Sequence, residues 1–173
     1  MAENRGKQFE SKVRECFARV SGVSIDRLHD QTNGYAGSSN ICDFIVYKKP
    51  HEYYIECKSV HGNTLSIHGN DPKHKYGNIT NKQWEGLLEK SIIPGVFAGI
   101  ICWWIDADET WFIPIHILQD AKENGEKSIN IRRPYMQGYW MPVDGKKKRV
   151  FFDYNMETFL RKMEHCGRWK YEV

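Results

Sequence analysis

This sequence has no long apolar run and no apolar leader. Residues 1–7 contain nothing like the hydrophobic segment of a signal peptide. No stretch approaches the roughly 18 consecutive apolar residues that a membrane-spanning helix needs. We therefore expect neither secretion nor membrane insertion.

Paired cysteines are missing too. The five cysteines are odd in number, and none of them forms a C-x-x-C motif. A disulfide framework and a zinc site of the usual spacing are thereby disfavoured, and we expect reduced thiols in a cytoplasmic protein. These residues are Cys16, Cys42, Cys57, Cys102 and Cys166.

The chain also lacks internal repeats, any linker rich in proline or glycine, and a strong excess of charge. Its 173 residues predict a single domain, residues 1–173, that is large enough for a substantial core. The formal net charge of +3 permits nucleic acid as a partner without singling it out.

Two apolar segments of strand length are the most informative feature that is present. Residues 41–47 and 53–59 are rich in Ile, Val, Tyr and Phe, and they flank a basic turn at 48–52. Such a pattern predicts a β-hairpin. Because side chains alternate along a strand, Glu56 and Lys58 should point to one face, and pairing can bring Asp43 beside Glu56.

Two carboxylates and one ammonium group would then converge at one point. Hard cations such as Mg²⁺ bind carboxylate, carbonyl, water and phosphate oxygens, and Lys58 could orient a water molecule or neutralise charge that develops in a transition state. The alternative is an ordinary half-exposed strand on which Glu56 and Lys58 are surface residues and Asp43 is unrelated to them.

Hydrophobic periodicity and turn residues predict the remaining elements, and together they indicate an α/β protein with a central mixed sheet flanked by helices. In the first half we expect a helix over 4–20, a loop over 21–40 and, after the hairpin, a helix from Thr80 to Lys90. A buried strand over 96–105 should follow with its return strand over 110–115 and a helix over 115–122. Short strands at 128–131 and 151–152 and a last helix containing Met156 and Met163 complete the expected order.

The chain resembles the RecU-type Holliday junction resolvases of the PD-(D/E)xK nuclease superfamily. The resemblance begins at Asn4-Arg5-Gly6-Lys7-Gln8-Phe9-Glu10 and continues through Asp43 and Glu56-Cys57-Lys58. Trp103-Trp104, Trp111-Phe112-Ile113-Pro114, Lys127-Ser128-Ile129 and Gly138-Tyr139 follow in the order of the family's second half, so it covers about residues 4–163. It implies a restriction-endonuclease-like core in a bacterial host cell, and Mg²⁺- or Mn²⁺-dependent cleavage that leaves a 5′-phosphate.

By this resemblance Asp43, Glu56 and the backbone carbonyl of Cys57 are metal ligands and Lys58 is the catalytic lysine. Glu10 would complete the acidic cluster directly or through water, although it could equally be a surface residue of the first helix. Gln83 would touch the site from the helix after the hairpin. However, Thr80-x-x-Gln83 is itself a capping box, which explains the glutamine without catalysis.

The resemblance and the distribution of basic residues also predict contacts with DNA. Ser38 and Ser39 lie in a loop that would reach the scissile phosphate, although simple turn chemistry also explains them. Further candidates are Arg5, Lys7, Lys48, Lys49, Lys73, Lys75, Arg132, Arg133 and the cluster Lys146-Lys147-Lys148-Arg149.

One departure from the family concerns its long stalk, which engages the centre of a four-way junction. Only residues 21–42 separate the first helix from Asp43, too few for such a stalk, and Cys42 replaces an expected hydroxyl side chain. A compact phage-type member of the family would fit these departures.

We expect a homodimer that cuts four-way or other branched DNA, with an interface from the strand around Trp103-Trp104 or from the first helix. The alternatives are a restriction-type endonuclease for linear duplex and an inactive module that binds branched DNA.

Overall fold

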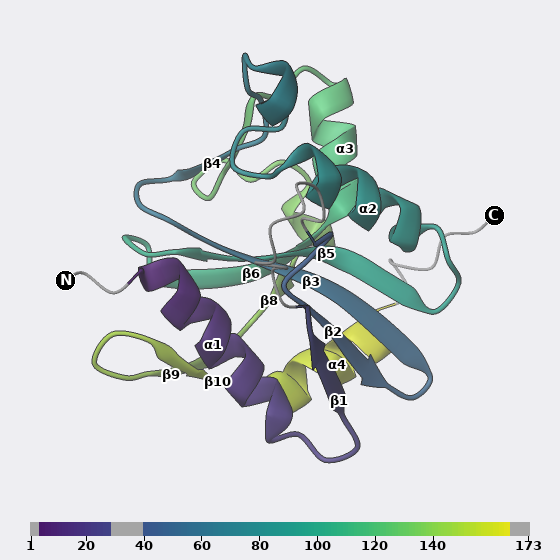
Figure 1. Ribbon diagram of the computed structural model, residues 1–173. Coiled ribbons are helices and arrows are strands. Elements are labelled where there is room, and N and C mark those ends of the chain that lie inside the picture. Colours follow the sequence, from purple (N-terminus) through teal and green to yellow (C-terminus); the bar gives the residue numbers. More distant parts are fainter. Residues whose placement is uncertain (1–3, 29–39, 167–173) are drawn as a thin grey trace, which may run out of the picture.

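The computed structural model describes residues 4–28 and 40–166, and these form three layers with a sheet between two pairs of helices (Figure 1). Helices α1 and α4 cover one face of the sheet, and α2 and α3 cover the other. The predicted α/β class with a mixed central sheet is confirmed. The helices are α1 (Arg5–Ala18), α2 (Asn81–Ser91), α3 (Ile115–Glu123) and α4 (Met156–His165).

Six strands form the central sheet in the order β1-β2-β3-β5-β6-β8. The pair β3–β5 is parallel and the other four pairs are antiparallel, which makes the sheet mixed. Its strands are β1 (Ser24–Arg27), β2 (Phe44–Lys48), β3 (His51–Val60), β5 (Val96–Trp104), β6 (Glu109–Pro114) and β8 (Met141–Pro142).

Two small sheets lie outside the central one. The first pairs β4 (Thr64–Ser66) with β7 (Ser128–Asn130), and the second pairs β9 (Gly145–Lys147) with β10 (Phe152–Tyr154). The short strands predicted at 128–131 and 151–152 therefore exist, but neither extends the central sheet. Short 3₁₀ turns complete the fold at η1 (Pro72–His74) and η2 (Gln137–Tyr139).

Adjacent tryptophans at the end of β5 show how the sheet divides the interior into two cores. Trp103 packs with the α1 and α4 side chains, and Trp104 packs with those of α2 and α3, because neighbouring residues of a strand face opposite ways. Their exposed fractions are 2% and 0%. The expected dimer interface around this pair is therefore wrong, since both rings are buried within one chain.

The first helix is buried along its apolar stripe in the same way. Phe9, Val13, Cys16 and Phe17 all lie in the core beneath α1, so this stripe is not free to bind a second subunit either. Asn4 caps the helix by accepting a hydrogen bond from the Gly6 backbone N–H. Among the described residues, no helix combines the length and the apolar character that a membrane crossing requires.

The segment 21–40, which was predicted to be a loop, contains β1. Ser24–Arg27 pairs antiparallel with β2, and Leu28 continues the pairing by donating to the Asp43 carbonyl at 3.0 Å. This edge strand was missed because its side chains are mostly exposed, so it shows little of the apolar alternation that marks a strand.

Candidate metal and catalytic site

The predicted hairpin forms and brings the two carboxylates together. Strands β2 and β3 pair with Phe44 opposite Ile55, and Asp43, one position earlier, donates its N–H to the Ile55 carbonyl at 3.1 Å. The Asp43 side chain then accepts a hydrogen bond from the Cys57 N–H at 2.7 Å. This bond fixes the Asp43 carboxylate beside the part of β3 that carries Glu56 and Lys58.

Glu56 lies in the interior of the sheet, between β2 and β5, and only 3% of its surface is exposed. The Lys58 ammonium group contacts Glu56 Oε1 at 2.8 Å from the same face of β3, as strand alternation predicts. The other oxygen, Glu56 Oε2, is buried and has no hydrogen-bond partner among the described residues. A buried carboxylate oxygen without a partner is costly, because its lost hydration is not replaced.

Gln83 serves both as a helix cap and as a site residue. Its Oε1 accepts from the Thr80 backbone N–H at 3.0 Å while Thr80 Oγ1 accepts from the Gln83 N–H at 3.2 Å, which completes the predicted capping box. Its Nε2 donates to Glu56 Oε1 at 2.7 Å, and Lys58 Nζ lies 3.4 Å from Gln83 Oε1. The capping box is therefore confirmed, and Gln83 also contacts Glu56, while its catalytic role stays a prediction.

Glu10 reaches toward the cluster from α1. Its carboxylate pairs with Arg27 Nε at 3.0 Å, and its side chain is 14% exposed. It is close enough to the other carboxylates that its charge contributes to raising the pKa values of both Asp43 and Glu56. Sequence reasoning missed Arg27, because this residue belongs to the overlooked strand β1.

Burial governs the electrostatics of the site. Burial first, and then the nearby charge of Glu56, raise the pKa of Asp43 to about 8. Burial also raises the pKa of Glu56, although Lys58 and Gln83 act in the opposite direction. Both carboxyl groups thus lack sufficient positive charge nearby, which is the situation that a bound cation relieves.

The donor set fits a hard divalent cation. Asp43 and Glu56 supply two carboxylates, one of which has an unsatisfied oxygen, and the Cys57 backbone follows on the same strand. Within residues 4–28 and 40–166, no three His, Cys, Asp or Glu side chains come together as a metal-binding group. A cation here would therefore use two carboxylates together with backbone, water or phosphate oxygens, as Mg²⁺ often does.

The predicted DNA-binding residues are distributed over several regions. Lys48 and Lys49 lie at the β2–β3 turn, roughly 20 Å from Lys58 at about 3.3 Å per residue of β3, and Lys48 contacts the Ser21 carbonyl instead. Arg5 contacts His61 just beyond β3, and Lys7 is exposed on the first turns of α1.

The other predicted contacts lie on the α2–α3 side of the fold. Arg132 bonds Asn63, Arg133 is exposed nearby, and Lys73 is exposed on η1. Lys75 is paired with Glu85. Ser38 and Ser39 lie outside the described residues.

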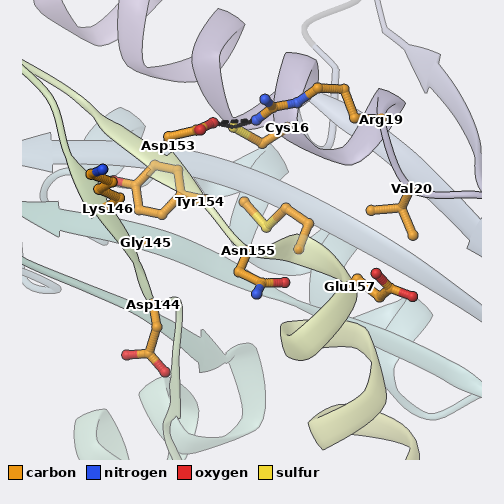
Figure 2. A pocket seen from close by; sticks show the side chains of 11 residues that line it. Cys16, Arg19, Val20, Asp144, Gly145, Lys146, Asp153, Tyr154, Asn155 and Glu157 are labelled. Carbon is orange, nitrogen blue, oxygen red and sulfur yellow. Dashed lines mark hydrogen bonds and ion pairs between the residues drawn. The ribbon is translucent and has the colours of Figure 1, made fainter.

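A separate hollow of about 600 Å³ lies between the C-terminal end of α1, the β9–β10 hairpin and the start of α4 (Figure 2). Cys16, Arg19, Lys146 and Asp153 are among its lining residues, and none of the predicted catalytic residues is. The hollow is thus distinct from the carboxylate cluster.

No family model matches this chain, and no curated protein matches it in sequence. Among solved structures, the chain is similar to Archaeoglobus fulgidus Hjc, a Holliday junction resolvase from an archaeal hyperthermophile. The two are 19% identical with a TM-score of 0.48, and the match covers 72% of this chain and 88% of that chain.

Proposed function

We propose that this protein is a metal-dependent DNA endonuclease that cleaves Holliday junctions or other branched DNA by phosphodiester hydrolysis. The observation that carries the proposal is the cluster of buried Glu56 with the partly buried Asp43 and Lys58, in which Glu56 Oε2 has no partner among the described residues. A sheet that served only as a scaffold would gain stability from apolar residues at these positions.

Asp43 and Glu56 would hold Mg²⁺ or Mn²⁺, together with the Cys57 carbonyl. When bound, such an ion polarises a phosphoryl oxygen and lowers the pKa of a coordinated water molecule. Glu10 would complete the acidic cluster directly or through water.

The protein's own side chains would act around that ion. Lys58, held beside Glu56 at 2.8 Å, places a positive charge where a phosphate would enter and can orient the attacking water. Gln83 keeps the Glu56 carboxylate in one rotamer by donating to Oε1 at 2.7 Å. The Cys57 N–H does the same for Asp43, so both ligands are positioned before a cation binds.

Branched DNA is the substrate class that the resemblance to RecU-type resolvases favours. A junction presents two equivalent strands related by two-fold symmetry, so a homodimer with one site per subunit would cut both. The restriction-type alternative shares the same carboxylate and lysine chemistry and differs in cutting linear duplex at a defined sequence.

A cleavage assay decides among these functions. We expect Mg²⁺ or Mn²⁺ to support cutting of four-way junctions in preference to linear duplex, with appreciable cutting of other branched forms such as flaps. Ca²⁺ should support binding only. Cutting that persists in EDTA would contradict the metal mechanism. Equal cutting of linear duplex at one sequence would favour the restriction-type enzyme, and binding of junctions without cleavage under any metal would favour the inactive module.

A further inference from the structure

The β9–β10 hairpin carries four consecutive cations on a small sheet of its own. Residues 146–149 read Lys-Lys-Lys-Arg, all four are exposed, and the turn closes with a hydrogen bond from the Lys148 N–H to the Phe151 carbonyl at 2.8 Å. This two-stranded sheet pairs with no other strand among the described residues, and it projects beside α1 (Figure 1). We call residues 145–154 the basic arm.

One of the four cations fixes the basic arm to the body of the protein. Lys147 forms an ion pair with Asp108 in the β5–β6 turn, and its ammonium group lies 4.7 Å from the centre of the Phe152 ring and 5.7 Å from that of Trp103. Asp108 has a backbone φ of 53°, a left-handed conformation that an aspartate or asparagine tolerates better than most residues. Lys147 thus links the hairpin to the β5–β6 turn.

The same β5–β6 turn also contacts the end of the strand that carries the catalytic candidates. Asp106, two residues before Asp108, accepts a hydrogen bond from the Gly62 N–H and lies 3.2 Å from His61 Nδ1. His61 and Gly62 directly follow β3, a few residues beyond Lys58. The basic arm and the carboxylate cluster therefore lie toward the same end of the central sheet, the end at which α1 begins (Figure 1). The arm packs on the α1–α4 face, whereas Glu56 and Lys58 point to the face that α2 covers.

The remaining three cations have no partner of their own. Lys146, Lys148 and Arg149 form no ion pair within the described part of the chain. The nearby aspartates are already paired, Asp144 with Lys162 and Asp153 with Arg19, although the charge of Lys148 also acts on Asp153. The arm thus presents three exposed cations that form no ion pair.

We propose that the basic arm binds the backbone of double-helical DNA that flanks the cleavage site, a role that rests on the nuclease function proposed above. Lysine and arginine side chains on an exposed hairpin match the phosphates of a duplex in charge and reach. Proteins that bind single strands add exposed aromatic rings on which the bases stack. Here Phe151 and Phe152 are only half exposed, and Phe152 lies under Lys147, so duplex is the occupant that the arm fits.

The first test removes the three unpaired charges and keeps the anchor. Binding of a fluorescent duplex and of a single strand of equal length would be measured in EDTA over a range of salt concentrations. The proteins compared are wild type, the arm variant Lys146→Ala/Lys148→Ala/Arg149→Ala, and a control that removes three exposed cations elsewhere, Arg14→Ala/Lys127→Ala/Arg161→Ala. We expect the arm variant to bind duplex about tenfold or more weakly near 100 mM salt, and its salt slope to fall by about 2 to 3, since each phosphate contact contributes about 0.9.

The control should change duplex affinity much less, and the arm variant should cleave at the wild-type rate once DNA is saturating. An equal loss in both triple variants, an unchanged salt slope, or a loss confined to the single strand would overturn the inference. So would a wild-type protein that does not bind duplex at all.

The second test asks whether position matters in addition to charge. Asp108→Asn removes a negative charge and retains a residue that tolerates left-handed backbone, so charge alone predicts tighter DNA binding. Because the substitution also releases Lys147, we expect weaker duplex binding, by about threefold or more. Tighter or unchanged binding would show that the arm does not need its anchor and would overturn this part of the inference.

The arm and the proposed function can fail separately. If wild type binds duplex through the arm but cleaves no DNA with Mg²⁺ or Mn²⁺, the nuclease proposal fails and the arm remains a duplex-binding element. If wild type cleaves branched DNA and the arm variant binds like wild type, only the arm inference is wrong.

Discussion

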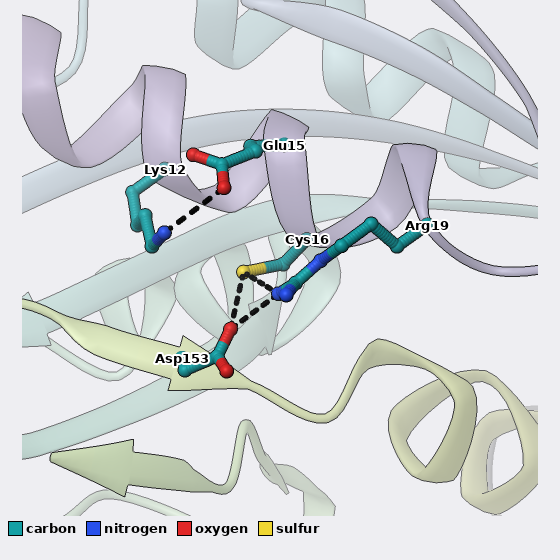
Figure 3. A network of polar contacts seen from close by, with 5 residues as sticks. All are labelled: Lys12, Glu15, Cys16, Arg19 and Asp153. Carbon is teal, nitrogen blue, oxygen red and sulfur yellow. Dashed lines mark hydrogen bonds and ion pairs between the residues drawn. The ribbon is translucent and has the colours of Figure 1, made fainter. Parts of the chain in front are cut away.

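Two carboxylate–cation pairs in this protein have opposite electrostatic consequences. Glu56 and Lys58 are nearly buried, with side chains 4% and 20% exposed, whereas Asp153 and Arg19 are 33% and 52% exposed (Figure 3). Burial raises the pKa of Glu56 despite its partner, while the hydrogen bond from Arg19 lowers the pKa of Asp153. The Asp153 carboxylate is thus fully compensated by Arg19. The buried carboxylate of Glu56, with Asp43 beside it, still lacks compensating positive charge.

The first prediction should give the largest effect. Asp43→Asn or Glu56→Gln should reduce cleavage by about a thousandfold or more, because each removes an anionic ligand and retains the shape. The same changes should stabilise the protein in EDTA. For Asp43→Asn we expect the free energy of unfolding to rise by about 2 to 4 kcal/mol at neutral pH. Each unit of pKa difference between the folded and unfolded states corresponds to about 1.4 kcal/mol.

Cleavage assays and denaturant unfolding in EDTA would measure the two effects. Adding Mg²⁺ should raise the melting temperature of the wild type and leave that of Asp43→Asn nearly unchanged. Variants that cut DNA like wild type would contradict the site, and variants that are less stable than wild type in EDTA would contradict the electrostatic argument.

Removing the cation of the buried pair gives the second prediction. If Lys58 faced an open site, Lys58→Ala would lose activity with little effect on stability. Because Lys58 instead contacts buried Glu56, we now expect both lost cleavage and a destabilisation of about 1 to 3 kcal/mol. The double variant Lys58→Ala/Glu56→Gln should recover most of that stability, and a double variant as unstable as the single one would show that the loss is not electrostatic.

Gln83 allows the third prediction, because its two roles can be separated. Thr80→Ala removes the cap and should cost about 1 kcal/mol of stability with nearly normal cleavage. Gln83→Ala removes the acceptor of the Thr80 N–H, which is the other half of the capping box, and the donor to Glu56. It should therefore cost similar stability and lower kcat about tenfold. Equal kcat values for the two variants, measured at saturating DNA and Mg²⁺, would reduce Gln83 to a capping residue.

The exposed pair supplies the smallest effect. Asp153→Asn should lower the melting temperature by only about 2 °C, since exposed ion pairs contribute little. The hydrogen bond from Arg19 lowers the pKa of Asp153 in the folded protein. The pair therefore stabilises the fold at pH values above the ordinary pKa of an aspartate, and this contribution is lost as the pH falls through the lowered pKa. Thermal melts of the two proteins should therefore differ at pH 7 and converge as acid protonates Asp153 in the folded protein.

Much of the site could be predicted from local sequence. The hairpin was predicted from two strand-like runs around a turn, and strand alternation then placed Glu56 and Lys58 on one face with Asp43 nearby. The same geometry places Lys48 and Lys49 far from Lys58, since the β2–β3 turn lies at the opposite end of β3. The contact of Gln83 with Glu56 depends on how α2 packs over β3, a long-range arrangement that a capping motif does not reveal.

Other features depended on partners far away in the sequence. The cluster 146–149 was recognised as basic, but its anchor on Asp108 arises only when the β5–β6 turn and the hairpin fold together. Likewise β1 is stabilised by pairing with β2 and by the contact of Arg27 with Glu10. Neither strand periodicity nor a family signature reports such tertiary contacts.

The parallel pairing of β3 with β5 also bears on how the protein folds. The β2–β3 hairpin closes a short loop and can form early, whereas β3 cannot pair with β5 until the long connection that carries α2 has crossed the sheet. Asp43 can therefore meet Glu56 well before Gln83 arrives to fix the Glu56 side chain. Cation affinity should consequently appear with the slower, non-local phase of refolding and not with formation of the hairpin.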